Sequence, residues 1–130
     1  MIAVTCALII EDGNVLICQR SPAMSLPGKW EFPGGKVEAG EAEAAAIVRE
    51  IREELHLDIR VTGTLQPVEY DYPAFRIRLV PFLARRIGGT LKLEEHADAR
   101  WVPIGTLDRY DWAPADLPIV EQLKALRSGF

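Results

Sequence analysis

The most restrictive feature of this sequence is a glycine-rich turn that leads into a helix carrying clustered carboxylates. The turn ends at Gly35, and the helix is expected over residues 41–55. Apolar residues recur along this helix at the spacings i, i+4, i+7 and i+11. They form one stripe, made by Ala44, Val48, Ile51 and Leu55. The stripe predicts which side of the helix faces the protein interior.

Three glutamates, Glu50, Glu53 and Glu54, are predicted on the opposite side of the helix, at about 100° per residue. Like charges at this spacing repel by roughly a few tenths of a kcal/mol per pair, so the cluster gives the helix no structural benefit. A divalent cation would turn this repulsion into attraction. The pattern therefore indicates metal ions held against a phosphate chain, whereas any one of these acids alone would be read as solvated surface.

Size and charge narrow the class of protein further. A chain of 130 residues with 48% hydrophobic and 26% charged residues is expected to form one domain over residues 1–130. Its net charge of −4 argues against a nucleic-acid polymer as partner, because such proteins usually carry a basic stripe. A small anionic ligand remains possible if a metal supplies positive charge.

Nothing in the sequence predicts a membrane or secretory protein. The longest apolar run, residues 7–10, is too short to span a bilayer, and the first residues lack the basic start of a signal peptide. A cytoplasmic location is expected by default. Cys6 and Cys18 lie in apolar segments without metal-ligand spacing, so we expect two buried free thiols.

The pattern of elements predicts an α/β protein. An Asp-Gly step at residues 12–13 predicts a hairpin, and the Pro- and Gly-containing segment 21–29 predicts a loop. A final amphipathic helix is expected to turn Ile119, Leu123 and Leu126 inward. Strands are expected at 2–10, 15–20, 59–68, 75–86 and 99–102, and helices at 41–55 and 119–126. Interleaved strands and helices favour a sandwich around a mixed sheet.

The spacing of the helix motif resembles the Nudix box: glycine, five residues, Glu, seven residues, Arg-Glu, an aliphatic residue, any residue, then Glu-Glu. The matching positions are Gly35, Glu41, Arg49, Glu50, Ile51, Glu53, Glu54 and Leu57. One position departs, because His56 stands where the family usually has a glycine that ends the helix in a left-handed conformation. The resemblance implies the Nudix fold, an α/β/α sandwich around a mixed sheet.

Beyond the box, the chain resembles the MutT-type and CTP pyrophosphohydrolase-like branch at residues 30–36, 69–73, 101 and 113–116. This resemblance implies a pyrophosphohydrolase that cleaves nucleoside triphosphates to monophosphate and pyrophosphate, with Mg²⁺ as cofactor and Mn²⁺ as an alternative. The implied metal ligands are Gly34, Glu50, Glu53, Glu54 and Glu95. Glu53 or Glu95 is expected to take the proton of the attacking water. Arg49 is expected to orient a glutamate, and Glu41 to fix the turn or assist a metal.

Six residues are candidates for substrate binding: Arg20, Glu31, Gly35, Lys36, Tyr72 and Asp116. Lys36 follows the glycine turn and is expected to meet phosphate, while Arg20 either contacts phosphate or caps the sheet. Asp116 either reads a donor edge of the base or caps the last helix, and Tyr72 either stacks on the base or belongs to the core. His56 and His96 are expected to be structural.

The base remains open between an oxidised purine such as 8-oxo-dGTP, CTP or dCTP, and a damaged pyrimidine, all compatible with sanitising of the nucleotide pool and hence with DNA repair. Rival substrates are ADP-ribose, dinucleoside polyphosphates and capped RNA, and a non-catalytic nucleotide sensor is a further alternative. The expected assembly is a monomer or a weak homodimer.

Overall fold

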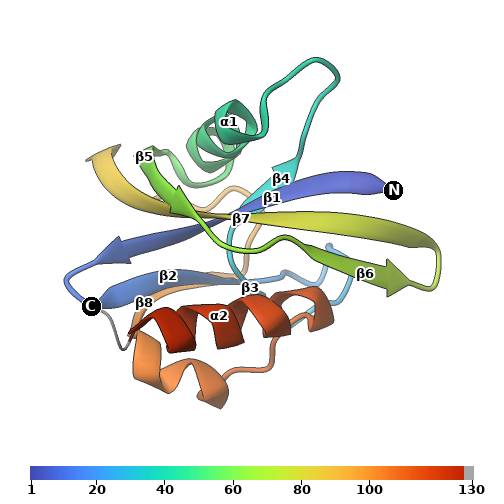
Figure 1. Ribbon diagram of the computed structural model, residues 1–130. Helices are drawn as coiled ribbons and strands as arrows, with labels where there is room; N and C mark the ends of the chain where they lie inside the picture. Colours follow the sequence, from blue (N-terminus) through green and yellow to red (C-terminus); the bar gives the residue numbers. More distant parts are fainter. Residues whose placement is uncertain (128–130) are drawn as a thin grey trace.

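The computed structural model describes residues 1–127 and shows a mixed sheet with one helical layer on each face (Figure 1). The expected α/β/α sandwich is confirmed. The elements are β1 Ile2–Glu11, β2 Asn14–Gln19, β3 Trp30–Glu31, β4 Gly34–Lys36, α1 Glu43–Leu55, β5 Leu57–Thr64, β6 Val68–Tyr72, β7 Phe75–Gly89, β8 Asp98–Pro103, the 3₁₀ helices η1 Ile104–Arg109 and η2 Pro114–Asp116, and α2 Leu117–Arg127.

Strand β1 lies in the middle of the sheet. It pairs in parallel with β7 over eight positions, from Ile2 opposite Ile77 to Ile9 opposite Ala84, and antiparallel with β2 and β4. The long strand β7 also pairs with β6 near its start and with β5 near its end. Strand β8 adds to the far side of β2. This topology brings the glycine-rich strand β4 directly beside β1.

The two faces of β1 supply two separate cores, as the alternation of side chains along a strand requires. Leu8 is buried with Ile119 of α2 on one face, and Ile9 is buried with Ile51 of α1 on the other. Figure 1 shows α1 and α2 on opposite sides of the sheet. Both thiols are buried and free, as expected, with Cys6 facing the α2 core and Cys18 the α1 core.

The apolar stripe of α1 differs in part from its prediction. Ile47, Ile51 and Leu55 are fully buried, but Ala44 is exposed in the first turn and Val48 is only half-buried. The buried line therefore runs through positions i, i+4 and i+8. Since this line is rotated toward residue 54, Glu54 is half-buried on the flank of the helix and does not lie opposite the stripe. Its placement was wrongly predicted.

Helix α1 ends at His56, which adopts the left-handed conformation with φ 58° and ψ 29°. Its N–H donates to the carbonyl of Arg52 at 3.1 Å, and its ring lies 2.6 Å from the carboxylate of Glu94. The expectation that histidine can replace the usual glycine at this terminus is confirmed. Backbone geometry is kept, and the side chain gains a partner on the loop before β8.

Tertiary pairing changes several predicted bounds. The strand expected over 59–68 breaks after Thr64, because the intervening loop is fixed by Gln122 of α2, which donates to the carbonyl of Gln66 and accepts from its N–H.

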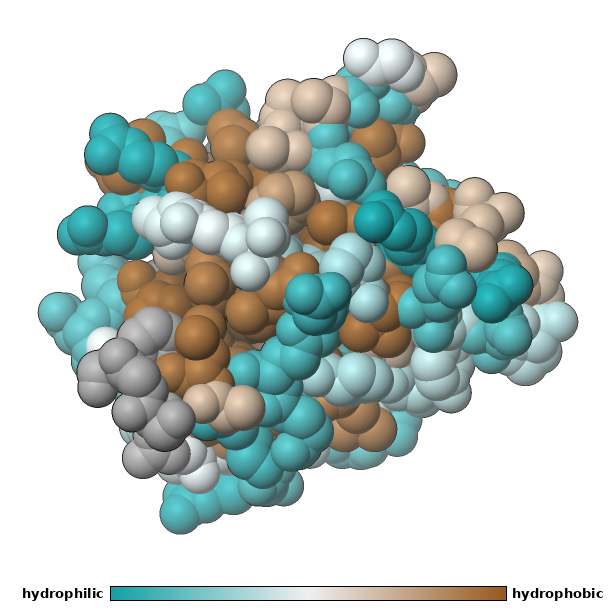
Figure 2. All heavy atoms as spheres, viewed as in Figure 1, coloured by the Kyte–Doolittle hydropathy of each residue, from teal (hydrophilic) through white to brown (hydrophobic). Residues whose placement is uncertain are grey.

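Leu126 is 36% exposed, not inward as predicted, and apolar atoms reach the surface in the region of α2 (Figure 2). Within residues 1–127 no helix combines the length and apolar character needed to cross a bilayer.

Candidate active site

A cavity of about 610 Å³ runs from the carboxylates of α1 to the start of α2. Glu54 lines it from α1, and Asp116 lines it from the segment before α2. The lining residues are 4–6, 20, 24–26, 31–32, 34–36, 54, 72–75, 77, 79, 113, 115 and 116. A volume of this size lies within the range of roughly 300–1,000 Å³ that small-molecule sites occupy.

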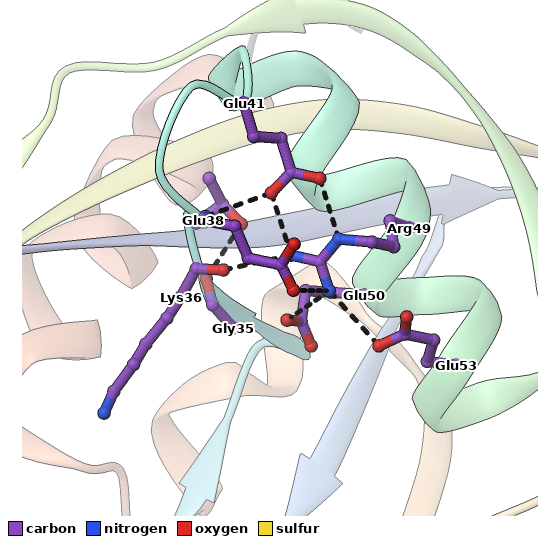
Figure 3. A network of polar contacts seen from close by, with 8 residues as sticks. Gly35, Lys36, Glu38, Glu41, Arg49, Glu50 and Glu53 are labelled. Carbon is purple, nitrogen blue, oxygen red and sulfur yellow. Dashed lines mark hydrogen bonds and ion pairs between the residues drawn. The ribbon is translucent and has the colours of Figure 1, made fainter.

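Arg49 is the centre of a polar network that joins α1 to the glycine turn (Figure 3). Its guanidinium contacts both carboxylate oxygens of Glu41, at 2.7 and 2.9 Å. The same group donates to Glu50 at 2.9 Å, to Glu53 at 3.2 Å and to the carbonyl of Lys36 at 3.2 Å. One fixed cation therefore orients three of the box glutamates and the end of the glycine turn.

Both carboxylate oxygens of Glu41 are hydrogen-bonded within this network. The bond from Arg49 lowers the pKa of Glu41 to about 2, and the N–H of Glu38 adds a bond at 3.1 Å. The N–H of Glu41 in turn donates to the carbonyl of Glu38 at 3.0 Å. Of the two roles expected for Glu41, the contacts favour fixing the turn before α1.

The two glycines before Lys36 allow strand, helix and cavity to meet. A Cβ atom at Gly34 would overlap the backbone of Thr5 and Cys6 on β1, and one at Gly35 would overlap the carboxyl group of Glu50. Any side chain at Gly35 would therefore displace Glu50 from its bond with Arg49. The hydroxyl of Thr5 donates to the carbonyl of Gly35 at 3.1 Å and holds the turn in place.

Glu54 is the box glutamate that reaches the cavity among residues 1–127. One of its oxygens, Oε2, is buried without a hydrogen-bond partner in the described part of the chain. Burial raises the pKa of Glu54 to about 8, with further contributions from the charges of Glu50, Glu31 and Glu95. A carboxyl group with one buried, unpartnered oxygen and other carboxylates nearby is an arrangement that a cation would stabilise.

The oxygen donors at this end fit a hard divalent cation, which binds carboxylates and carbonyls. Within residues 1–127 no three His, Cys, Asp or Glu side chains are gathered tightly enough to form a complete metal centre. Arg49 already engages Oε1 of Glu50, which limits the free oxygens of that side chain. The unpartnered oxygen of Glu54 is the observation that supports a metal at this position.

Three of the predicted ligands, Glu50, Glu53 and Glu95, lie outside the cavity lining. Glu53 is exposed on the outer side of α1, with 59% of its side chain accessible, and its contact is with Arg49 (Figure 3). Glu95 is exposed on the loop before β8, yet it lies near enough for its charge to raise the pKa of Glu54. The structure thus brings Glu95 toward Glu54 and leaves Glu53 at the rim of the carboxylate cluster.

Lys36 lines the cavity next to the carboxylates. Its side chain extends away from the Arg49 network (Figure 3), and its ammonium group has no ion-pair or hydrogen-bond partner in the described chain. A lysine ammonium without a partner suits an anionic ligand such as a phosphate group.

Arg20 and Glu31 form an internal pair along the cavity wall. Nη1 of Arg20 lies 2.7 Å from Oε1 of Glu31, and the remaining guanidinium donors reach the carbonyl and the hydroxyl of Ser25. Oε2 of Glu31 lies 2.8 Å from Nε2 of His96, a ring with a side-chain exposure of 1%. Both oxygens of Glu31 therefore already have donors, and Arg20 braces the 21–29 loop.

Asp116 closes the other end of the cavity. The hydrogen bonds of Trp30 with Asp111 and Ala113 tie the segment before η2 to β3. This contact places Asp116 opposite Phe32, whose N–H donates to its carboxyl group at 2.9 Å. Among the described residues, its contact is across the cavity and not with the N–H groups of α2, so the helix-cap alternative is not supported.

The burial of Asp116 changes the pKa of its carboxyl group. Removal from water, followed by the nearby charge of Glu31, raises the pKa of Asp116 well above its usual value. A protonated carboxyl group both donates and accepts hydrogen bonds, whereas an ionised one only accepts. The role of Asp116 in reading a donor edge of the base stays a prediction.

Aromatic side chains form one wall near Asp116. Tyr72 stacks between Tyr70 and Phe75, with ring centroids 4.7 and 5.4 Å away, and its hydroxyl accepts from the N–H of Ala115 at 3.3 Å. Phe75 is 47% exposed at the cavity mouth. Tyr72 is thus part of the wall and is held in place by the segment that carries Asp116.

Sequence reasoning missed three contributors to the site. Thr5 and Phe32 give no local signal, because their contacts join segments far apart in the chain. His96 was expected to be structural, and no motif connects it to Glu31. A polar residue set between apolar neighbours in Trp30-Glu31-Phe32 is the one signal that could have indicated a buried carboxylate needing several donors.

The fold is an α/β/α sandwich whose box helix presents Glu54 to a cavity, as the Nudix class does, and the chain belongs to the NUDIX domain family, which matches residues 1–123. It is 37% identical to the CTP pyrophosphohydrolase of Escherichia coli strain K12, over 99% of this chain and 96% of that protein. It is 34% identical to a putative 8-oxo-dGTP diphosphatase 2 of Mycobacterium tuberculosis, over 97% of this chain and 90% of that protein. The solution structure of the E. coli ORF135 protein superposes with a TM-score of 0.86 at 36% identity, covering 99% of this chain and 92% of that one.

Proposed function

We propose that this protein is a divalent-metal-dependent pyrophosphohydrolase, a single Nudix domain that cleaves nucleoside or deoxynucleoside triphosphates to monophosphate and pyrophosphate. The relatives named CTP pyrophosphohydrolase and 8-oxo-dGTP diphosphatase support a nucleotide-pool role. Pyrimidine triphosphates of the CTP type and oxidised guanine nucleotides are the candidate substrates.

The observation that carries this proposal is one cavity with two chemically different ends. The lining at the Glu54 end includes a buried, unpartnered carboxylate oxygen, and Lys36 also lines the cavity with a free ammonium; both suit a metal-bound phosphate chain. The Asp116 end is walled by Phe32 and Tyr72, which suits a flat base with polar edges. A single nucleotide can span both ends.

The residues of this chain divide the work by position. Glu50, Glu54 and the backbone at Gly34 would hold Mg²⁺, with Mn²⁺ as a substitute, and a bound cation would neutralise phosphate charge and acidify water. Arg49 keeps Glu50 in place, and Lys36 meets phosphate. Glu53 or Glu95 accepts the proton of the attacking water, each being free of burial.

Asp116 is the residue that we assign to base recognition. Because Arg20 and His96 already donate to both oxygens of Glu31, that carboxylate supports the wall more than it reads the base. The partners are small nucleotides, and we propose that the protein acts as a monomer. ADP-ribose and dinucleoside polyphosphates remain competing substrates of the same carboxylate cluster.

The first experiment is a substrate panel. Purified protein with Mg²⁺ is incubated with CTP, dCTP, dGTP, 8-oxo-dGTP and ADP-ribose, and the products are separated by chromatography. We expect monophosphate and pyrophosphate in equal amounts from one of the triphosphates, with turnover abolished by EDTA. Faster release of AMP from ADP-ribose than of any monophosphate from a triphosphate would contradict the proposal. Binding of nucleotides without turnover of any of them would indicate a sensor.

A further inference from the structure

We propose that His96 is a positioning residue, which holds Glu31 on the cavity wall and keeps Glu95 beside Glu54. The inference rests on the proposed function and extends it to a residue outside the cavity. Its ring nitrogen Nε2 lies 2.8 Å from Oε2 of Glu31, and the side chain is almost fully buried. Because a carboxylate that is ion-paired with Arg20 only accepts hydrogen bonds, we assign the ring nitrogen as the donor of this bond.

Glu31 needs donors on both oxygens because of where it stands. Its charge contributes to the raised pKa of Glu54 on one side and of Asp116 on the other. Each of these two groups repels Glu31 when it is ionised, and a free Glu31 side chain would then turn away from the cavity. Arg20 holds one oxygen and His96 the other, so the pair of donors fixes the side chain between the two ends of the cavity.

The loop that carries His96 also carries Glu95. Its backbone is tied to α1 by bonds from the N–H of Lys92 to the carbonyl of Leu55 and from the N–H of Glu94 to the carbonyl of Glu54. On the other side of Glu95, the N–H of Ala97 donates to Gln19 of β2 at 2.9 Å. The ring of His96 adds the side-chain contact that pulls this part of the loop against the cavity wall.

The result is a continuous chain of polar contacts from Ser25 through Arg20 and Glu31 to His96. Ser25 and Arg20 line the cavity, and His96 adjoins the exposed carboxylate of Glu95. These contacts fix the 21–29 loop, on the proposed nucleoside side, relative to the loop that carries Glu95 and His96, on the proposed metal side. Supporting contacts of this kind typically affect activity by about 10–100-fold when they are lost.

Two substitutions separate positioning from packing. His96→Leu preserves apolar volume and removes the donor, whereas His96→Gln keeps an amide N–H near the position of Nε2. If His96 only fills space, the leucine variant equals or exceeds the glutamine variant. We expect instead that His96→Leu lowers kcat on the preferred triphosphate by about 10–100-fold. His96→Gln should stay within about threefold of the unmodified protein, because its amide can replace the lost donor.

A double-mutant cycle tests whether the effect passes through Glu31. Glu31→Gln, His96→Leu and the double variant are compared for kcat and KM. Residues that act through one contact give non-additive effects, so we expect the double variant to be no worse than the poorer single variant. Fully additive losses, or a glutamine variant as slow as the leucine variant, would overturn the proposal. His56→Gly, which removes the other histidine contact of this loop at Glu94, is the matched control and should retain turnover.

A measurement without metal or nucleotide separates this inference from the proposed function. Amide hydrogen exchange is followed by NMR at Glu94 and Ala97, whose N–H groups anchor the loop. We expect His96→Leu to lower protection at both amides by about tenfold or more, and His96→Gln to leave it unchanged. Unchanged protection in His96→Leu would refute the positioning role whatever the turnover. If the unmodified protein hydrolyses nothing in the substrate panel, the proposed function fails, and the exchange comparison alone decides the role of His96.

Discussion

Glu53 and Glu54 are neighbours in sequence but stand in opposite surroundings. The side chain of Glu53 is 59% exposed and touches Arg49, whereas Glu54 faces the cavity with one oxygen buried and without a partner among the described residues. Different surroundings give two carboxylates different chemistry at the same pH. The accessible one is suited to exchange a proton with water, and the buried one to bind a cation.

This contrast predicts the outcome of Glu53→Gln. The side chain makes one 3.2 Å contact at the surface, so the variant should fold with a melting temperature within a few degrees of the unmodified protein. If Glu53 is the base, kcat should fall by several orders of magnitude while nucleotide binding persists. Steady-state rates and nucleotide titration measure both. Near-normal turnover would transfer the role to Glu95, for which Glu95→Gln is the companion variant.

Glu54 predicts how stability depends on pH when metal is absent. Its pKa is raised from 4.5 to about 8 in the folded protein, so the folded state keeps a proton that the unfolded chain releases between these values. Stability contributed by this group is therefore present below about pH 4.5 and declines as pH rises toward about 8. In EDTA, Glu54→Gln should be the more stable protein at pH 8, and the two should converge at pH 4.5. Urea unfolding at both pH values checks this. A variant that is less stable at pH 8 would contradict it.

At the scale of single elements, α1 shows which features of a helix can be predicted from the spacing of its apolar residues and which cannot. The helix and its buried Ile51 and Leu55 follow from local sequence alone, and its left-handed end was suggested by the resemblance to the Nudix box. The shift of the buried line to Ile47, which places Glu54 on the flank, does not. That rotation is set by how the helix rests on β1, and residue spacing gives no measure of it.

Variants at His56 measure how much the left-handed conformation at the end of α1 costs in folding stability. The αL conformation favours glycine, and the contact of His56 with Glu94 at 2.6 Å partly offsets the difference. His56→Gly and His56→Ala both lose that contact, but only glycine is free of strain at φ 58°. We expect the glycine variant to be more stable than the alanine variant by about 1 kcal/mol. Denaturant unfolding decides, and equal stabilities would mean that the helix end relaxes.

Strands β4 and β6 mark the limit of prediction from local pattern. Gly34-Gly35-Lys36 has no β-propensity and is a strand because β1 lies beside it. Strand β6 is separated from β5 by a loop whose position is fixed by Gln122, more than fifty residues later in the chain. Such contacts are invisible to any short window of sequence.

At the scale of the whole molecule, the site joins segments that the sequence keeps apart. The glycine turn and box helix predicted most of the carboxylate end, because Gly34, Glu50 and Glu54 lie within one short segment. The other end needs β1, the 21–29 loop, the turn after Tyr72 and the segment before α2 to meet. Only the resemblance to relatives suggested Asp116, and neither route suggested His96.

A ligand that bridges both ends should stabilise the entire fold. With Mg²⁺ and a triphosphate analogue carrying a methylene between the α and β phosphorus atoms, saturation at 100 times Kd is worth about 2.7 kcal/mol. We expect a rise in melting temperature of several degrees that is largely lost in EDTA. Glu54→Gln should show a smaller rise than the unmodified protein. A shift of equal size with and without metal would indicate binding that bypasses the carboxylate cluster.

The central position of β1 has a consequence for how the protein is made. Its parallel neighbour is β7, so Ile2 must wait for Ile77 and Ile9 for Ala84 before they can pair. During synthesis the apolar β1 strand leaves the ribosome long before this partner exists, and parallel pairing over such a separation closes slowly. The nascent chain therefore carries the β7-facing edge of β1 without its partner until residues 77–84 have been made, and such an edge favours aggregation of the incomplete chain.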